Sequence, residues 1–268
     1  MSFKNFKYLL FLILFTSCDD VFEYHPYDVN ISGEKHINGK NIQKIESKLK
    51  DKDTLRVAFV ADTQGWLDQT RDFVKDVNKK GNADFVIHLG DITDYGNTKD
   101  FMWQRDILNK LDVPYVVIIG NHDVLGTGDE AFVEIFGEHN YSFIAGRTKF
   151  VCLNTNAIEY DYSTPVPDFD FMEEEIIKDK DQYDNTVMCM HAPPFNEQFN
   201  NNVVKSFERY VNAFKGILFC TAGHVHRYEA KDLYDDGLIY YCCDCVKHRN
   251  YMLFTITKDK YEYEIIYF

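Results

Sequence analysis

The hydrophobic positions along this chain follow two alternating patterns. Short continuous apolar runs, which are typical of buried strands, occupy 54–61, 84–89 and 115–119. Between these runs, apolar residues recur at helical spacing over 66–79 and 98–111. This order of strand, helix, strand, helix and strand predicts parallel pairing of the three strands through right-handed crossover connections.

The rest of the chain is richer in strands than in helices. We predict six further strands, at 148–153, 185–190, 216–221, 237–243, 251–257 and 261–267. No internal repeat or low-complexity tract interrupts the sequence between these elements. The pattern therefore predicts one layered α/β domain over 53–268.

The N-terminus has the pattern of an export signal. Lys4 and Lys7 precede an apolar run over 8–15, which is far shorter than the ~20 residues of a membrane-spanning helix. Small residues and then Cys18 follow this run, and the sequence resembles the lipobox of bacterial lipoproteins. The resemblance implies a signal peptide over 1–17, removed when a lipid has been attached to Cys18.

Lipidation of Cys18 would leave the mature protein exported and anchored to the lipid bilayer of a bacterial membrane, on the periplasmic face or the cell surface. An ordinary cleaved signal followed by an incidental cysteine is the alternative. Residues 18–52 are polar, with a weak helical stripe between Ile42 and Leu49. We interpret them as a tether with one short helix that docks on the main domain, 53–268.

The overall charge limits the possible partners. The chain has 29 basic and 43 acidic residues, for a net charge of −14, within an otherwise globular composition. A chain this acidic lacks the basic face that nucleic-acid binding requires, and it is unsuited to binding an anionic lipid surface through charge. An anionic substrate would have to be attracted by a local feature such as a metal ion. The oligomeric state is left open by the sequence.

Polar residues that can bind metals follow the predicted buried strands, at the point where each strand ends. They form five motifs: Asp62-Thr63-Gln64, Gly90-Asp91-Ile92-Thr93-Asp94, Gly120-Asn121-His122-Asp123, His191, and Gly223-His224-Val225-His226. The carboxyl ends of strands are where open α/β sheets bind ligands. Aspartate, asparagine and histidine are ligands of divalent cations such as manganese, iron and zinc. The sequence therefore predicts a metal centre assembled from distant segments.

The order of these motifs over about 54–230 resembles the calcineurin-like metallophosphoesterases, whose signature is D-x-H, G-D-x-x-D, G-N-H-D/E, a lone His and G-H-x-H. The resemblance implies a layered α/β fold, with a central β-sandwich flanked by helices. It also implies two divalent metal ions, either manganese, iron, zinc or magnesium. Turn and cap residues occurring in this order by coincidence are the alternative, but turn chemistry does not explain the recurring histidines.

The family pattern assigns the metal ligands residue by residue. By this resemblance the first metal would be held by Asp62, Gln64 and His226, the second by Asn121, His191 and His224, and both by Asp91. Two divalent ions would outweigh the two carboxylates and leave a local positive charge that attracts phosphate. The globally acidic chain could then still bind an anionic substrate.

The same resemblance makes His122 and Asp94 the catalytic residues. It implies hydrolysis of a phosphomonoester or phosphodiester by a hydroxide held between the two metals, with His122 as general acid. The carboxylate of Asp94 would orient the His122 ring. Tyr95 stands where phosphoprotein phosphatases of this superfamily carry an arginine, which favours a small or polymer-linked phosphoester as substrate.

One position departs from the family pattern. Gln64 stands where the first motif usually has a histidine, and a carboxamide oxygen is a weaker and harder ligand than an imidazole nitrogen. A weakened first metal site leaves a second interpretation open, namely a membrane-anchored pseudoenzyme or binding lipoprotein. We favour retained activity because His122 and Asp94 are both present.

The cysteines and one loop complete the sequence-based picture. Six cysteines follow Cys18, and most lie in apolar runs, which predicts buried thiols, although an oxidising compartment permits disulfides. The Cys242–Cys245 cluster lacks the paired spacing of a zinc site. The aromatic and acidic loop 154–171 is either a specificity lid or an ordinary surface loop.

Overall fold

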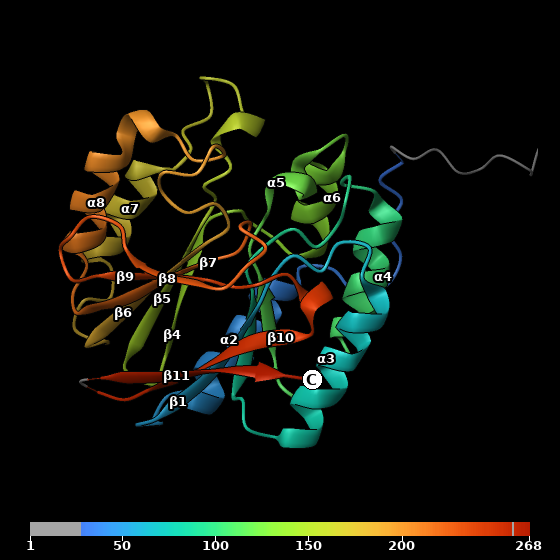
Figure 1. Cartoon of the computed structure of the whole chain (residues 1–268), viewed down its shortest axis with the longest axis horizontal. Helices are drawn as coiled ribbons and strands as arrows, with labels where there is room; N and C mark the ends of the chain where they lie inside the picture. The colour runs from blue at the N-terminus through green and yellow to red at the C-terminus, as the bar shows by residue number, and fades with distance from the viewer. Residues whose placement is uncertain (1–27, 259) are drawn as a thin grey trace, which may run out of the picture.

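Two β-sheets stacked face to face form the centre of the structure, and helices cover both outer faces (Figure 1). The structure is a computed structural model that describes residues 28–258 and 260–268. The predicted signal peptide, 1–17, and the predicted lipidation site, Cys18, lie outside the described residues. The predicted sandwich flanked by helices is confirmed.

The first sheet contains the N-terminal strands of the sequence prediction. Its order is β11-β10-β1-β2-β3, made of β11 (Tyr261–Tyr267), β10 (Asn250–Ile256), β1 (Leu55–Val60), β2 (Phe85–His88) and β3 (Tyr115–Val117). The crossover helices are α3 (Leu67–Lys80) and α4 (Thr98–Leu108). Strands β1, β2 and β3 are parallel, as predicted, and β10 and β11 extend the sheet antiparallel.

The second sheet contains the strands from the middle of the chain. Its order is β4-β5-β6-β7-β9-β8, made of β4 (Tyr141–Ala145), β5 (Thr148–Leu153), β6 (Asn185–Met190), β7 (Ile217–Ala222), β9 (Ile239–Cys242) and β8 (Glu229–Asp232). Its four inner strands are parallel, and the edge strands β4 and β8 are antiparallel to their neighbours. The two edge strands were not predicted, because strands exposed on one side or at an edge need no continuous apolar run.

Four further helices complete the layers. They are α5 (Asn121–Val124), α6 (Gly128–Ile135), α7 (Phe169–Ile177) and α8 (Val204–Ala213), with 3₁₀ turns η1 (Ala157–Glu159), η2 (Asn201–Val203) and η3 (Val246–His248). Apolar residues of α3, α4 and α6 share one buried cluster with the outer face of the first sheet. Residues of α7 and α8 share another cluster with the second sheet. Each sheet is therefore covered on its outer side by its own helices.

Aliphatic side chains and a set of phenylalanine rings fill the space between the sheets. Phe85 of the first sheet meets Phe150 of the second edge to face, with ring centroids 5.2 Å apart. Phe254 and Phe219 stack across the same interface at 4.4 Å. All four rings are fully buried, and paired aromatic rings of this kind contribute about 0.5–1.5 kcal/mol beyond their buried area. This packing fixes the two sheets relative to each other, which matters because both contribute to the site described below.

Helix α2 (Ile37–Leu49) lies where the sequence predicted a short docking helix, and it closes the open edge of the first sheet at β3. The Asn38 side chain donates to the carbonyl oxygen of Val117 at 2.8 Å and accepts from the Val117 amide at 2.9 Å. One helix turn further on, Asn41 donates to the carbonyl oxygen of Tyr115 at 2.8 Å. These amides satisfy edge groups that a neighbouring strand would otherwise pair.

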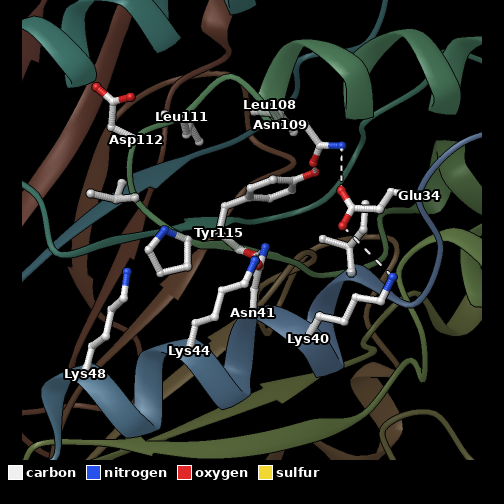
Figure 2. A pocket seen from close by; sticks show the side chains of 13 residues that line it. Glu34, Lys40, Asn41, Lys44, Lys48, Leu108, Asn109, Leu111, Asp112 and Tyr115 are labelled. Atoms are coloured by element: carbon white, nitrogen blue, oxygen red, sulfur yellow. Dashed lines mark hydrogen bonds and ion pairs between the residues drawn. The ribbon is translucent and has the colours of Figure 1, made fainter.

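A groove of about 280 Å³ runs between α2 and the segment that leads into β3 (Figure 2). Lys40, Lys44 and Lys48 line it from the helix, and Tyr115 lines it from the opposite wall. Lys44 is held by the side chain of Asn41 at 3.0 Å. The groove contains none of the predicted metal ligands.

The six cysteines within the described part of the chain are buried and free, so the prediction of buried thiols is confirmed there. Two of them hold backbone near the first strand: Cys243 Sγ donates to the Phe59 carbonyl oxygen at 3.2 Å, and Cys245 Sγ to that of Asp62 at 3.1 Å. Over residues 28–258 and 260–268, none of the helices has the length and apolar character needed to cross a membrane.

Candidate metal centre

All five predicted motifs meet at the carboxyl ends of strands from both sheets. The first three follow β1, β2 and β3 of the first sheet, and the last two follow β6 and β7 of the second. Many of the site residues have left-handed backbone, with φ of 54° at Asp62, 38° at Gln64, 55° at Asp91, 69° at His224 and 52° at His226. Such backbone is costly for residues other than glycine and is concentrated at functional sites.

One glycine allows two of these loops to touch. A Cβ atom at Gly120 would lie 2.1 Å from the Asp91 amide nitrogen and 2.2 Å from Asp91 Oδ1. Any side chain at this position would therefore push the loop that carries Asn121 away from the loop that carries Asp91. The glycine of the third motif is required by this close approach.

Asp62, Asp91 and His226 form the first group of potential metal ligands. Their ligand atoms lie within 4.8 Å of one another, and His226 Nε2 is 3.3 Å from Asp62 Oδ1. The two carboxylates are buried, whereas the His226 side chain is 44% exposed. The two carboxylates of this group are thus closed to solvent, and the site is open on the side of His226.

Asp91, His191 and His224 form the second group, again within 4.8 Å. Asn121 Oδ1 lies between the two rings, 3.1 Å from His191 Nε2 and 2.9 Å from His224 Nδ1. His191 Nε2 is also 3.3 Å from Asp91 Oδ1. The structure therefore brings Asp91 into both groups and places Asn121 in the second, the arrangement that the resemblance implied.

The donor set fits a cation. His191 Nδ1 lies 2.7 Å from the Leu89 carbonyl oxygen, which can only accept, so Nδ1 carries a proton. In a neutral ring the Nε2 lone pair then faces oxygen atoms of Asn121 and Asp91. Converging lone pairs 3.1–3.3 Å apart have the spacing of donors that share a metal at ~2.0–2.2 Å.

The titration behaviour of the buried pair agrees with this fit. Burial lowers the pKa of His191, but the nearby carboxylates of Asp91 and Asp62 outweigh burial and raise the pKa to about 9. Burial raises the pKa of Asp91, and the charge and hydrogen bond of His191 reverse that effect and lower it. A pKa this high places a proton on Nε2 when no ion is bound, and a divalent ion would take the place of that proton. A buried acidic site that attracts positive charge in this way suits such an ion.

The contact between His122 and Asp94 differs from the prediction. His122 Nδ1 lies 2.7 Å from the backbone carbonyl oxygen of Asp94, so the predicted carboxylate–imidazole hydrogen bond is wrong. The Asp94 carboxylate instead reaches over Gly65, where a Cβ atom would be 2.8 Å from Asp94 Oδ2. The His122 amide donates to Asp91 Oδ1 at 3.0 Å, which ties this residue to the shared ligand.

Gln64 is buried and is held at the site by its backbone. Its amide donates to the carbonyl oxygen of Asp91 at 3.1 Å, and its own carbonyl oxygen accepts from Gln104 Nε2 at 2.6 Å. Gln104 also donates to the Thr63 carbonyl oxygen at 3.2 Å. Residue 64 therefore sits beside the shared ligand, as the motif predicted.

Asp123 has a supporting role that was not predicted from the sequence. This fully buried carboxylate accepts hydrogen bonds from the amides of Ile92, Thr93 and Gly120, at 2.8–3.1 Å, and from the Thr93 hydroxyl at 3.0 Å. Burial and the nearby Asp91 raise its pKa to about 7. Asp123 joins the second motif to the third, and its place at the end of the G-N-H-D motif was the available signal.

His88 and Glu197 were also missed, and neither has a motif to mark it. His88 is fully buried; its Nδ1 accepts from the Gly90 amide at 3.2 Å, so Nε2 donates to Thr63 Oγ1 at 2.9 Å. Burial and the nearby His191 lower its pKa to about 3, which keeps the ring neutral. Glu197 Oε1 lies 3.4 Å from His224 Nε2, on the opposite side of the ring from Asn121.

A sequence profile of calcineurin-like phosphoesterases matches residues 55–228, and the chain therefore belongs to this family. The matched range contains every residue of the two ligand groups. Calcineurin-like phosphoesterases are hydrolases that work with two divalent metal ions, so the predicted family, enzyme class and two-metal cofactor are confirmed at this level.

Individual relatives are distant. The probable glycerophosphodiester phosphodiesterase GpdQ of Arcobacter nitrofigilis is 25% identical over 163 residues, covering 56% of this chain and 59% of that protein. The uncharacterized protein YvnB of Bacillus subtilis is 25% identical over 223 residues, covering 69% of this chain and 16% of that protein. The chain thus spans less than two thirds of the length of each of these curated relatives.

Among solved structures, a dimetal phosphatase from Danio rerio superposes with a TM-score of 0.60 at 12% identity. The superposition covers 78% of this chain and 98% of that one. At this level of identity the likeness shows a shared fold. It agrees with the two stacked sheets and their covering helices.

Proposed function

We propose that this chain hydrolyses phosphomonoesters or phosphodiesters at the site formed by the five motifs. The observation that carries the proposal is the position of Asp91, which belongs to both ligand groups and so can bridge two ions. Two divalent ions held by these groups would supply Lewis acidity, lower the pKa of bound water and neutralise phosphate charge. The family match supports the reaction class.

The chain's own residues supply a proton and the geometry. Because Nδ1 of His122 is committed to the Asp94 carbonyl oxygen, a protonated His122 can offer its Nε2–H to the oxygen of the leaving alcohol. The hydrogen bond between the His122 amide and Asp91 fixes the backbone of the acid relative to the shared ligand. His122 is half-buried, which leaves one side of its ring accessible to a substrate.

The test is a panel of phosphomonoesters and phosphodiesters offered to the purified chain after reconstitution with manganese, iron, zinc or magnesium. Glycerophosphodiesters belong in the panel because one relative is named as a probable phosphodiesterase for them. We expect hydrolysis with at least one metal and none after chelation. Failure with every metal and substrate would overturn the proposal.

A binding protein with a weakened first metal site is the second candidate, and the observation that favours it is Gln64 in place of a histidine. Such a protein would bind one metal tightly and hydrolyse none of the panel. Metal stoichiometry, measured together with turnover, separates the two candidates. The first group still offers two buried carboxylates and His226, which supports an occupied first site and an active enzyme.

We further propose that the protein is exported and lipid-anchored through Cys18, as the resemblance to the lipobox implies. The support is sequence alone, since this cysteine lies outside the described residues. Cys18→Ala should release the protein from the bacterial membrane fraction or block its maturation. Unchanged mass and unchanged membrane association would overturn this proposal.

A further inference from the structure

A cavity of about 180 Å³ lies among residues that flank the metal-site histidines in the chain. Pro193, two residues after His191, forms part of one wall, and Val225 separates His224 from His226. Both residues are apolar, although Val225 lies directly between two candidate metal ligands. We call this cavity the ring pocket.

The opposite wall comes from a part of the chain beyond the family match, which ends at residue 228. Leu233 follows β8, and Tyr240 and Cys242 belong to β9. Tyr240 and Cys242 are buried, so they form a fixed apolar floor. The pocket therefore combines loops that carry the candidate metal ligands with a hairpin that lies beyond the range of the family match. Segments that border such a site are where substrate selectivity is expected to reside.

Phe195 lies at the rim of the pocket, with a backbone conformation that is unfavourable for a bulky side chain. Its φ is +68°, in the left-handed region that bulky residues rarely adopt, and 56% of the residue is exposed. Its amide donates to Asn201 Oδ1 at 2.9 Å, and its ring lies 5.3 Å from that of Tyr234. Strained backbone that is held by surrounding contacts is concentrated at active sites and ligand clamps, and the exposed ring of Phe195 is available to contact a ligand here.

Charges at the rim favour an anionic ester. Glu229 lies between two cations: its Oε1 is 2.6 Å from Arg227 Nε, and its Oε2 is 2.7 Å from Lys231 Nζ. Both cations line the pocket and remain largely exposed, so the rim keeps one net positive charge. The apolar interior is large enough for one six-membered ring, because a cavity of about 150 Å³ accepts benzene.

We propose that the ring pocket binds the organic group of the substrate, and that it selects phosphoesters whose alcohol carries a single apolar ring. The inference rests on the proposed phosphoesterase function, because it assumes that the phosphoryl group sits at the metal centre. The ring would pack between Phe195 and Leu233, which both line the pocket, while the phosphoryl group would occupy the metal centre.

The experiment measures binding separately from turnover. Metal-loaded protein is titrated calorimetrically with benzylphosphonate and with methylphosphonate, which share the phosphonate group and cannot be hydrolysed as esters. We expect benzylphosphonate to bind at least roughly ten-fold more tightly, the order expected for filling a small apolar pocket. Equal affinities would overturn the ring pocket even if the enzyme hydrolyses phosphoesters. Absence of turnover with the ring preference intact would overturn only the proposed function.

Variants then locate the preference. Leu233→Asp and Phe195→Ala should each reduce the affinity ratio of the two phosphonates toward one, because each weakens the binding of the ring of benzylphosphonate. Phe195 is exposed, so its variant is informative even if Leu233→Asp fails to fold. Ile177→Asp is the matched control, since Ile177 is 72% exposed at the end of α7 and does not line the pocket. A wild-type ratio in both pocket variants would place the ring elsewhere and overturn the proposal.

Discussion

His122 Nδ1 donates a hydrogen bond to the backbone carbonyl oxygen of Asp94, at 2.7 Å. The carbonyl oxygen accepts this hydrogen bond, but it carries no negative charge and does not take the proton from the ring. The contact therefore fixes the orientation and tautomer of His122 without placing a negative charge beside it. The side chain of Asp94 is therefore not needed for this orientation. The two residues should respond differently to substitution.

We expect His122→Ala to retain both metals and to lose roughly 10²–10⁴-fold in turnover, the usual contribution of a general acid. Asp94→Asn should leave turnover nearly unchanged, because the backbone carbonyl that holds the ring remains. Metal content by mass spectrometry and kcat for a phosphoester substrate test both statements. A large loss in Asp94→Asn would show that its carboxylate acts directly, and loss of metal in His122→Ala would show that His122 is a ligand.

Glu197 should increase the affinity of the second site for its metal. His224 presents Nδ1 to Asn121 at 2.9 Å and Nε2 to Glu197 at 3.4 Å, so the carboxylate can hold the ring and increase its basicity as a ligand. Removing such a partner typically costs 10–100-fold in metal affinity. Since Glu197 is 74% exposed, we expect Glu197→Ala to reduce the metal affinity by about ten-fold, near the lower end of this range.

Competition with a fluorescent chelator measures this affinity. Glu197→Gln, which keeps a hydrogen-bond acceptor, should recover part of the loss. Glu173→Ala is a control, because Glu173 is an exposed carboxylate on α7 that bonds to Tyr210. Equal metal affinity in Glu197→Ala and wild type would show that the contact has no role in metal binding.

Gln64→His should restore the usual first motif of the family. A nitrogen donor suits zinc and iron, whereas a carboxamide oxygen suits magnesium and manganese. In the wild type we therefore expect the first site to bind zinc or iron more weakly than the second. The substitution should tighten the first site and shift the metal preference of activity toward zinc or iron.

Metal titration of the wild type and Gln64→His, with activity followed in parallel, tests this prediction. Two equally tight sites in the wild type, unchanged by the substitution, would mean that the Gln64 side chain is not a ligand. The buried backbone of residue 64, bonded to Asp91 and Gln104, should accept the histidine without moving the loop.

The fold was predictable wherever burial leaves a continuous pattern. Strands buried on both faces, such as β2 and β6, appear in the sequence as short runs of mostly apolar residues. The edge strand β8, Glu229–Asp232, has mostly exposed residues and carries no such signal. Helix α2 was expected only as a docking element, because the hydrogen bonds of Asn38 to Val117 depend on a contact across 79 positions.

The site was predictable to the extent that its chemistry lies in short motifs. The position of the motifs at strand ends, together with their resemblance to the family signature, predicted that Asp91 and His224 belong to one centre, and the structure groups them there. The hydrogen-bond partner of His122 could not be predicted from the motifs. A motif specifies which residues are present, but not whether the carboxylate or the backbone carbonyl of Asp94 accepts the bond. Glu197 lies in a loop whose path is set by tertiary packing, and no local pattern marks it.

Asn38→Ala should destabilise the protein, because it removes the side chain that pairs with the backbone of the edge strand β3. Asn38 is 3% exposed, and its side chain is bonded to both the amide and the carbonyl of Val117. Tyr141 also donates to that carbonyl, at 2.8 Å, so the main loss is an unsatisfied buried amide. We expect a cost of about 1–3 kcal/mol in the free energy of unfolding.

Urea denaturation measures this cost, and Gln43→Ala, at an exposed position on the same helix, is the matched control. The same reasoning predicts that a chain starting at residue 53 is less stable than one starting at residue 28, because it lacks α2 altogether. Equal stability of the two chains would show that the helix does not protect the edge.

The buried pair of Glu175 and Lys149 should make stability depend on pH. Glu175 Oε2 lies 2.7 Å from Lys149 Nζ, with the two side chains only 4% and 1% exposed. Burial raises the pKa of Glu175, but hydrogen bonds from Lys149, Lys178 and Ser142 outweigh burial and bring the pKa below its usual value of 4.5. A carboxyl whose pKa is lower in the folded state stabilises the protein above its unfolded pKa.

That contribution should be complete above about pH 4.5 and should disappear as the pH falls through the lower folded pKa. Glu175→Gln leaves the Lys149 charge buried without its partner, so we expect a loss of about 3–5 kcal/mol at neutral pH. Because the wild type loses the same charge in acid, the difference between the two proteins should shrink below pH 4.5. Urea denaturation at a series of pH values, with Glu174→Gln at the exposed neighbouring position as control, tests this dependence. A difference that stays constant from neutral to acidic pH would show that Glu175 contributes through packing and neutral hydrogen bonds, and that its charge has no net effect.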